Sequence, residues 1–201
     1  MLESGNIDPA TLVRELREPG AAAYALIGPA DCRELAAAAR AFEFEPQPET
    51  VGPEERRVRQ RLASVQMGSD PGPFRTLAAA IEGLAHDIHG WLPESPWAAP
   101  PRFNDFLLQR YPPGPFALTP HLDGKRYTDL VVVAVFAGSA TFCVCADRAG
   151  NGRVAMSAPP GSVIFMRAPG FDGAEDNRPF HGVLDVTAER YTLGMRFNSR
   201  R

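Results

Sequence analysis

Cysteine and long apolar stretches are scarce in this sequence, and each scarcity excludes a class of protein. The longest apolar run, residues 130–137, is far shorter than the roughly 20 residues that a helix needs to cross a bilayer. Residues 1–8 carry acidic side chains and no apolar core, so they do not have the pattern of a secretory signal. We therefore expect a soluble, cytoplasmic protein with no membrane partner.

The 3 cysteines are an odd number, which already leaves one without a partner. Cys143 and Cys145 stand two apart in a strand-like run, where a bridge between them is disfavoured, and Cys32 is isolated in the sequence. No further thiol or imidazole follows at a recognisable zinc-binding spacing. We interpret all three as small buried side chains of a protein in a reducing compartment.

The sequence also lacks a strong excess of one charge, since it has 21 basic and 24 acidic residues and a formal net charge of -3. This balance argues against a surface built as a whole for nucleic acid, although a local basic groove stays open. The length of 201 residues fits a single domain with a sizeable core.

Residues 1–100 have mainly helical periodicity and are expected to form a support region. Asp8 and Pro9 begin an amphipathic run that ends before Pro19. A second helix is expected at 34–42 with Asp31 as its cap. A third is expected at 73–91, where apolar side chains recur every three or four positions.

Residues 101–201 change to short apolar segments separated by Gly, Pro and Asn turns. Strands are expected at 106–111, 130–136, 141–145, 154–156, 163–166, 182–186 and 191–197. Short strands at near-regular spacing are typical of a sandwich or jelly-roll barrel. The fold class is therefore α+β, with the N-terminal helices covering the outer face of one sheet.

A polar segment rich in arginine lies between the second and third expected helices, at 46–69. The simpler interpretation is a solvated loop and helix face. The alternative is a flap at the mouth of an active site, from which Arg56, Arg59 or Arg61 meets an anionic group of a substrate. The sequence alone leaves both open.

Two side chains that bind metals, His121 and Asp123, stand two positions apart, so an extended backbone points both to one face. On its own such a pair is more often part of a surface turn. His86 and His89 fall in the third expected helix, whereas His181 begins a late strand. Two imidazoles and one carboxylate make the facial set of iron(II) oxygenases, with positions left open for other ligands.

The strand expected at 191–197 alternates strictly between two faces. Tyr191, Leu193, Met195 and Phe197 share one face, and Arg190, Thr192, Gly194 and Arg196 share the other. Two arginines on the face of a core strand are costly unless they meet anions. A dicarboxylate such as 2-oxoglutarate supplies such anions, because the planar guanidinium matches a carboxylate. The alternative is an edge strand with both arginines in water.

Residues 104–197 resemble the iron(II)/2-oxoglutarate dioxygenase superfamily. In that family a His-x-Asp pair is followed by a distal His and then by an Arg, often with a hydroxyl residue after it. His121, Asp123, His181, Arg190 and Thr192 occupy these places in the same order. The resemblance implies a double-stranded β-helix, a jelly-roll or cupin-like core, over 101–201.

The local motifs are most similar to the AlkB-type branch, in the segment around Tyr111 and in the strand that begins at Arg190. By that resemblance Tyr111 and Arg190 hold the distal carboxylate of 2-oxoglutarate, and Arg196 lies near the metal-side end. Gln109 and Thr192 join the co-substrate site, although each stands where the branch has Asn. No nucleotide-recognition lid is identifiable in 1–100.

The implied activity is that of a dioxygenase that uses iron(II), 2-oxoglutarate and O2 and releases succinate and CO2. Hydroxylation of a small molecule is the first hypothesis, because an acidic chain without a recognition lid is a poor match to nucleic acid. An AlkB-type oxidative demethylase of nucleic acid and a peptide or protein hydroxylase are the alternatives. A cupin-like binding protein would more often carry a His-x-His pair. The substrate and the oligomeric state stay open.

Overall fold

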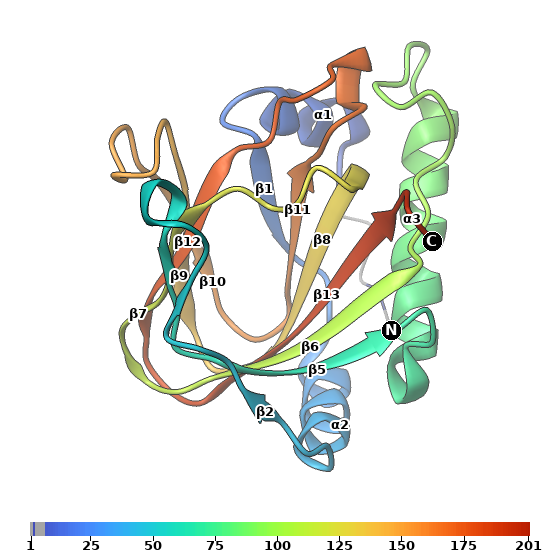
Figure 1. Cartoon of the computed structure of the whole chain (residues 1–201). Coiled ribbons are helices and arrows are strands. Elements are labelled where there is room, and N and C mark those ends of the chain that lie inside the picture. Colours follow the sequence, from blue (N-terminus) through green and yellow to red (C-terminus); the bar gives the residue numbers. More distant parts are fainter. Residues whose placement is uncertain (1, 3–6) are drawn as a thin grey trace.

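The computed structural model describes residue 2 and residues 7–201. In this part of the chain a larger and a smaller antiparallel sheet face each other, and helices cover the outer side of the larger sheet (Figure 1). The helices are α1 (Pro9–Arg17), α2 (Pro29–Arg40) and α3 (Arg75–Trp91), with short 3-10 turns at Glu54–Arg56, Gly72–Phe74 and Phe171–Gly173.

The larger sheet has the strand order β1 (Ala21–Ala25), β11 (Ser162–Arg167), β8 (Tyr127–Ala137), β13 (Arg190–Asn198), β6 (Asp105–Tyr111), β5 (Ala63–Gly68) and β2 (Glu45–Pro46). The smaller sheet has the order β10 (Val154–Ala158), β9 (Ala140–Cys145), β12 (Phe180–Val186) and β7 (Gly114–His121). A separate two-stranded ribbon pairs β3 (Thr50–Val51) with β4 (Val58–Arg59). Two packed antiparallel sheets with flanking helices confirm the expected α+β jelly-roll fold.

Each face of the larger sheet has its own core, because side chains alternate along a strand. Leu193 and Met195 of β13 face α1, α2 and α3 and are fully buried there. A second apolar cluster fills the space between the two sheets, with Val135 from β8 and Phe142 from β9. The even-numbered residues of β13, beginning with Arg190, therefore face the interior between the sheets. They share one face, as the sequence pattern predicted.

The helical predictions hold in position but not in every detail. Asp8 caps α1 by accepting a hydrogen bond from the backbone N–H of Thr11 at 3.0 Å. Asp31, expected as the cap of α2, lies inside its first turn instead, and Gly28 occupies the cap position before Pro29. Proline is well suited to this first helical position because its missing N–H would be unpaired there anyway.

Residues 1–100 contribute more than helices, since β1, β2 and β5 belong to the larger sheet. The expected strands also missed β7, whose sequence contains Pro115 and Pro120. β7 lies at the edge of the smaller sheet, where a missing backbone N–H is tolerated. No described helix is long and apolar enough to span a membrane.

Gly138 sits in the tight connection between β8 and β9, where the chain passes close to the start of β13. Its φ is 67°, and a Cβ there would lie 2.7 Å from Cα of Arg190 and 2.7 Å from the carbonyl oxygen of Glu189. Gly173 has a similar φ of 71° but no atom within 4 Å of its would-be Cβ. Alanine variants at the two glycines therefore distinguish the cost of the left-handed backbone, which both have, from the cost of close packing, which only Gly138 adds.

We expect Gly173→Ala to lower the free energy of unfolding by about 1 kcal/mol, the cost of the left-handed conformation. Gly138→Ala should lower it by roughly 2–4 kcal/mol, because an overpacking cost of about 1–3 kcal/mol is added. Urea denaturation of both variants measures the difference. Equal losses would contradict the close approach of β13 to this turn.

Candidate metal and co-substrate site

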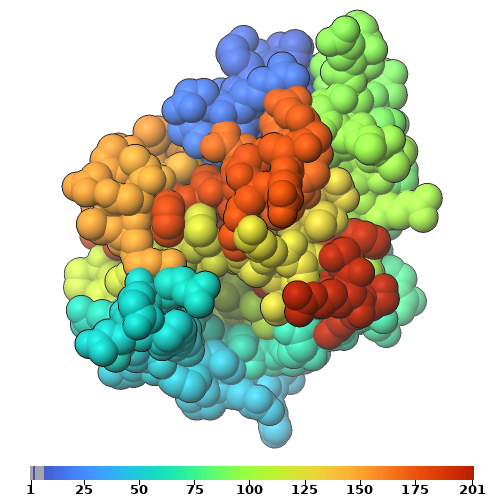
Figure 2. All heavy atoms as spheres, turned by 45° about the horizontal axis from the view of Figure 1, so that its top comes forward, coloured from blue at the N-terminus to red at the C-terminus, as the bar shows by residue number. Residues whose placement is uncertain are grey.

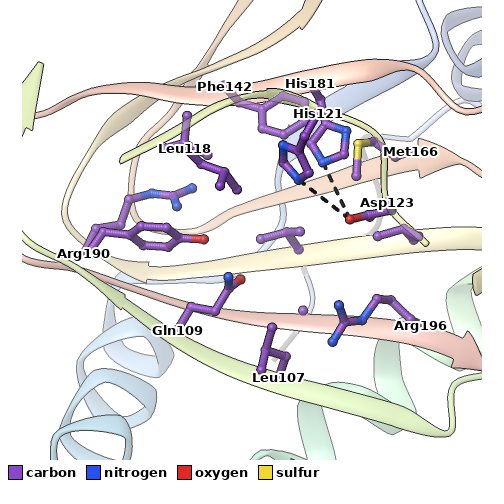
Figure 3. A pocket seen from close by; sticks show the side chains of 15 residues that line it. Leu107, Gln109, Leu118, His121, Asp123, Phe142, Met166, His181, Arg190 and Arg196 are labelled. Atoms are coloured by element: carbon purple, nitrogen blue, oxygen red, sulfur yellow. Dashed lines mark ion pairs between the residues drawn. The ribbon is translucent and has the colours of Figure 1, made fainter. Parts of the chain in front are cut away.

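The end of β7 and the start of β12 bring three metal-binding side chains together. His121 pairs directly with His181 across the two antiparallel strands, and Asp123 follows in the loop after β7. Oδ1 of Asp123 lies 3.8 Å from Nε2 of His121 and 4.0 Å from Nε2 of His181 (Figure 3). One donor atom from each residue lies within 4.8 Å of the others, so the three can converge on one ion.

Both imidazoles are held in the tautomer that leaves Nε2 free to bind a metal. Nδ1 of His121 lies 3.1 Å from the carbonyl oxygen of Thr119, and Nδ1 of His181 lies 3.1 Å from that of Pro179. A carbonyl oxygen only accepts, so Nδ1 carries the proton and Nε2 presents its lone pair toward Asp123. The backbone two residues before each histidine therefore orients the ring.

The charge states also suit a cation. Burial, followed by the nearby His181, lowers the pKa of His121 to about 4, so this imidazole is neutral at pH 7. Burial by itself raises the pKa of Asp123, but His181, His121 and the cations of Arg196 and Arg178 outweigh it and hold that pKa below its usual value. His121 and Asp123 are thus ready to bind a cation without first losing a proton.

Arg178 ties the Asp123 loop to the segment before His181. Its Nη1 donates to the backbone carbonyl of Asp123, while Nε and Nη2 each donate to Asp176 at 2.7 Å. Lys125 reaches the same Asp176 carboxylate at 3.1 Å. The two segments that carry metal ligands are therefore linked by charged hydrogen bonds. Arg178 was not among the residues predicted for the site, and the only signal for it in the sequence is its place three residues before His181.

Arg190 lies at the first position of β13, fully buried with 1% of its surface exposed. Two of its guanidinium nitrogens, Nε and Nη2, have no hydrogen-bond partner in the described structure, and the same holds for Oγ1 of Thr192. Tyr111 pairs with Arg190 across β6 and β13, and the guanidinium lies 5.4 Å from its ring centre. Burial lowers the pKa of Arg190, yet arginine stays charged in proteins. A buried cation without a partner calls for an anion.

A cavity of about 80 Å³ joins Arg190 to the three metal-binding side chains. Figure 3 shows Arg190 on one side of it and His121, Asp123 and His181 on the other, with Gln109 pointing in from β6. The remaining wall is mostly apolar and includes Leu107, Leu118, Val131, Val133, Phe142, Met166 and Val183. A short molecule that is anionic at the far end and able to bind a metal at the near end fits this arrangement.

Arg196 also faces the cavity, but its charge has a partner. Its Nη2 donates to Oδ1 of Asp105 at 3.1 Å, and its guanidinium lies 4.4 Å from the ring centre of Tyr127. Asp105 is itself 2% exposed and also accepts from Asn198 at 3.2 Å. The two arginines of the β13 motif therefore differ, because Arg190 is unpaired and Arg196 is held in a buried ion pair near Asp123.

The small cavity opens into a wider cleft of about 550 Å³, seen as a hollow between the teal and yellow segments in Figure 2. Gln60 and Leu62 line this cleft, whereas Arg56, Arg59 and Arg61 are absent from the linings of both cavities. The segment does border the mouth, since the backbone N–H of Arg59 donates to Oγ1 of Thr119 at 2.9 Å.

The helix expected through the arginine segment is wrong. Glu54–Arg56 forms a single 3-10 turn, and Val58–Arg59 is a short strand. The chain is extended beyond that point, so alternate side chains face opposite ways. Gln60 and Leu62 face the cleft, and Arg59 stacks on the ring of Phe116 at 4.8 Å.

The cysteines and the two histidines of α3, which the sequence did not assign to the metal site, lie outside it. Cys32, Cys143 and Cys145 are free and buried, and His89 of α3 bonds to Oγ of Ser95 at 2.7 Å. Neither His86 nor His89 belongs to a metal-binding cluster in the described part of the chain.

Comparison with solved structures identifies the fold. The chain is similar to a prolyl-4-hydroxylase from Pseudomonas putida, with 23% identity, a TM-score of 0.60, and coverage of 96% of this chain and 100% of that one. It is similar to the non-heme alpha ketoglutarate dependent carbocyclase SnoK of nogalamycin biosynthesis, at 15% identity and a TM-score of 0.64 over 96% and 84% of the two chains. OsALKBH1 matches at 16% identity and a TM-score of 0.60 over 89% and 98%.

No protein-family model matches the sequence, and no curated protein does either. The structural similarities therefore establish the fold, which this chain shares with the prolyl-4-hydroxylase, the carbocyclase and OsALKBH1. The AlkB-type branch is one of several branches that share it, so the branch expected from the local motifs is not singled out.

We expect His181→Ala and His121→Ala to weaken binding of iron(II), or of cobalt(II) as an air-stable substitute, by about 100-fold or more. Loss of an outer partner of a metal ligand already costs about 10- to 100-fold, and loss of the ligand itself costs more. Calorimetric titration measures the affinity, with His89→Ala as the control outside the site. An equal loss in the control would contradict the assignment of these ligands.

The lowered pKa of His121 also predicts how the stability of the metal-free protein depends on pH. The unfolded chain takes up a proton near the usual value of 6.5, whereas the folded chain excludes it down to about 4. Stability should therefore be lost as the pH falls from about 6.5 toward about 4. His121→Gln should lose less over that range in urea denaturation. The same pH dependence in parent and variant would disprove the role of this histidine.

Proposed function

We propose that this protein is a non-haem iron(II)- and 2-oxoglutarate-dependent oxygenase. The single observation that carries the proposal is the pairing, within one cavity, of a facial metal-binding set with a fully buried arginine that lacks an anion. The set of His121, Asp123 and His181 has the ligand types that suit iron(II). The unpaired guanidinium of Arg190 fits a carboxylate at the opposite end.

His121, Asp123 and His181 would hold the iron, and Arg190 would take the distal carboxylate of 2-oxoglutarate in a bidentate pair. Tyr111 lies beside that guanidinium and closes the end of the cavity. Thr192, with its unpaired hydroxyl, and Gln109, which points into the cavity, supply further hydrogen bonds to the co-substrate. Arg196, held in place by Asp105, lies at the metal end of the cavity and helps to keep the carboxyl of Asp123 charged.

When bound, iron(II) would activate O2, which is the oxidant, and 2-oxoglutarate would supply two of the four electrons that reduce it. Overall, one oxygen atom of O2 enters the succinate that forms as CO2 leaves, and the other converts a substrate C–H into C–OH. The chain's own residues hold the reactants and exclude water. The apolar wall of Phe142, Met166 and Val183 offers water no hydrogen-bond partners on that side of the inner cavity, which strengthens the charged contacts inside it.

A small molecule is the substrate class that we propose, in the reducing cytoplasm that suits three free cysteines. The outer cleft of about 550 Å³ has the size of a pocket for a small ligand. Nucleic acid demethylation is less favoured, because the chain has a net charge of -3 and Glu45 lines the cleft. Hydroxylation of a peptide, as the prolyl-4-hydroxylase similarity would imply, is the other alternative.

We expect the iron-loaded protein to convert 2-oxoglutarate to succinate slowly without its substrate. Arg190→Ala should raise the KM for 2-oxoglutarate by an amount equal to about 2–5 kcal/mol, because a buried charged pair is lost. Metal affinity should stay nearly unchanged, since Arg190 is not a ligand. Arg190→Lys should recover only part of the loss, because lysine keeps the charge without the bidentate geometry.

Succinate formation and cobalt(II) titration on the same preparations separate the two effects. Arg153→Ala, which removes an exposed arginine outside both cavities, is the matched control. If Arg190→Ala leaves the KM for 2-oxoglutarate unchanged, the co-substrate assignment is wrong. If the parent protein forms no succinate with any metal loading, the proposed function itself fails.

A further inference from the structure

One wall of the outer cleft offers hydrogen-bond acceptors. Gln47, Gln60 and Gln66 line the cleft. Gln47 donates its amide nitrogen to the carbonyl oxygen of Glu45 at 3.1 Å, and Gln60 donates to that of Pro48 at 2.8 Å. Gln66 donates to Asp105 and to the carbonyl of Phe106, both at 3.2 Å. All these partners only accept, so the amide nitrogens are fixed toward the protein. The amide oxygens are left for a ligand.

Glu45 adds a negative charge to the same wall. It stands on β2, at the edge of the larger sheet, and lines the cleft together with Gln47 and Ser64 of β5. No ion pair joins Glu45 to any residue that the structure describes. Three amide oxygens and one carboxylate on one wall suit a positively charged donor, such as an ammonium group.

The wall formed by the loop after β7 carries the opposite charge. Arg126 lines the cleft there, next to Gly124 and Tyr127. Its guanidinium lies 4.4 Å from the ring centre of Tyr127 and donates to that phenol oxygen at 2.7 Å, which fixes its direction. Arg126 forms no ion pair with a described residue either. A preorganised cation of this kind suits a carboxylate.

Between these charges the floor of the cleft is apolar and contains the metal-binding residues. Leu62, Leu107 and Leu118 line it beside His121 and Asp123. Leu107 and Leu118 also line the inner cavity, so they mark the passage from the cleft to the metal-binding side chains. A ligand held at both charged walls would therefore present its aliphatic part to the site where the iron is proposed to bind.

We propose that the substrate is a small zwitterion, an amino acid or an amino-acid derivative with an aliphatic portion. Its ammonium group is bound by Glu45 with the amide oxygens of Gln47 and Gln60, and its carboxylate is bound by Arg126. The inference rests on the proposed oxygenase function and adds the substrate class. A polyanionic strand does not fit, because its phosphates would face Glu45 and three amide oxygens.

The test measures succinate formation by the iron-loaded parent protein in the presence of matched compounds. The panel contains free L-amino acids with aliphatic side chains, their N-acetyl derivatives, their carboxamides, and a methylated single-stranded oligonucleotide. At least one free amino acid should raise succinate formation above the substrate-free rate and should itself gain one oxygen atom. Removing either charge from that compound should raise the concentration needed for half-maximal stimulation by about tenfold or more, since one charged wall is then left without a partner.

Two variants then assign the charged walls. Glu45→Gln should raise the KM for the stimulating amino acid by about tenfold or more, and Arg126→Gln should do the same, as expected for a lost charge-assisted hydrogen bond. For the N-acetyl compound, which lacks the ammonium group, Glu45→Gln and the parent protein should have the same KM. Glu55→Gln, which removes an exposed carboxylate outside the cleft, is the control and should leave the KM unchanged.

The outcomes distinguish this inference from the function on which it rests. A parent protein that forms succinate alone but is stimulated only by the blocked compounds, only by the oligonucleotide, or by none of the panel overturns the zwitterion inference and leaves the oxygenase proposal intact. A loss in Arg59→Ala without a loss in Arg126→Gln would move the anion contact to the arginine segment and would also overturn it. A parent protein that forms no succinate removes both proposals.

Discussion

The antiparallel pairing of β7 with β12 is the constraint on which the site depends. It sets His121 opposite His181, and a slip of one residue would turn one of the two imidazoles to the other face of the sheet. Gly182 allows the close approach, because a Cβ there would lie 2.8 Å from the carbonyl oxygen of Leu118. Two register shifts follow, one between His181 and Val183 and one between Val183 and Leu184, before the two strands pair regularly again. A single strand contact thus positions two ligands that are far apart in the sequence.

The second requirement is a separation of charge along the inner cavity. Asp123 stands at one end, where its carboxylate is surrounded by imidazoles and by the cations of Arg178 and Arg196. Arg190 stands at the other end, and no carboxylate of the described residues pairs with it. The protein neutralises Arg196 with the buried Asp105 but leaves Arg190 open. The two ends of the cavity therefore differ, since the Asp123 end suits a metal ion and the Arg190 end suits a carboxylate.

The sequence predicted what depends on local periodicity. The alternation along β13 correctly put Arg190 and Leu193 on opposite faces, because a strand shows its two faces in its own sequence. That the Leu193 face packs on the helices came from the structure. The same reasoning missed β7, whose prolines look like turn signals and are tolerated because the strand lies at a sheet edge. It also missed the alanine-rich β1, since pairing with β11 and not intrinsic propensity makes that segment a strand.

The residues that line the outer cleft could not be predicted from the sequence, for a different reason. The sequence suggested that an arginine of residues 56–61 contacts the substrate. In the extended chain, Gln60 and Leu62 line the cleft and the arginines do not. Glu45 comes from β2, and it reaches the same wall only because β2 pairs with β5. Which side chain of such a segment faces a ligand depends on long-range strand pairing, and one sequence without its fold does not contain that information.

The unpaired guanidinium of Arg190 has a consequence for the lifetime of the protein in the cell. A buried charge without a counter-ion lowers the stability of the empty fold, and a ligand that pairs with it stabilises the folded state by mass action. A destabilised fold opens more often and is degraded faster, because proteases and chaperones act on the open population. The abundance of the protein would then rise and fall with the metabolite that fills the cavity, so that supply of the co-substrate would govern the amount of protein as well as its turnover.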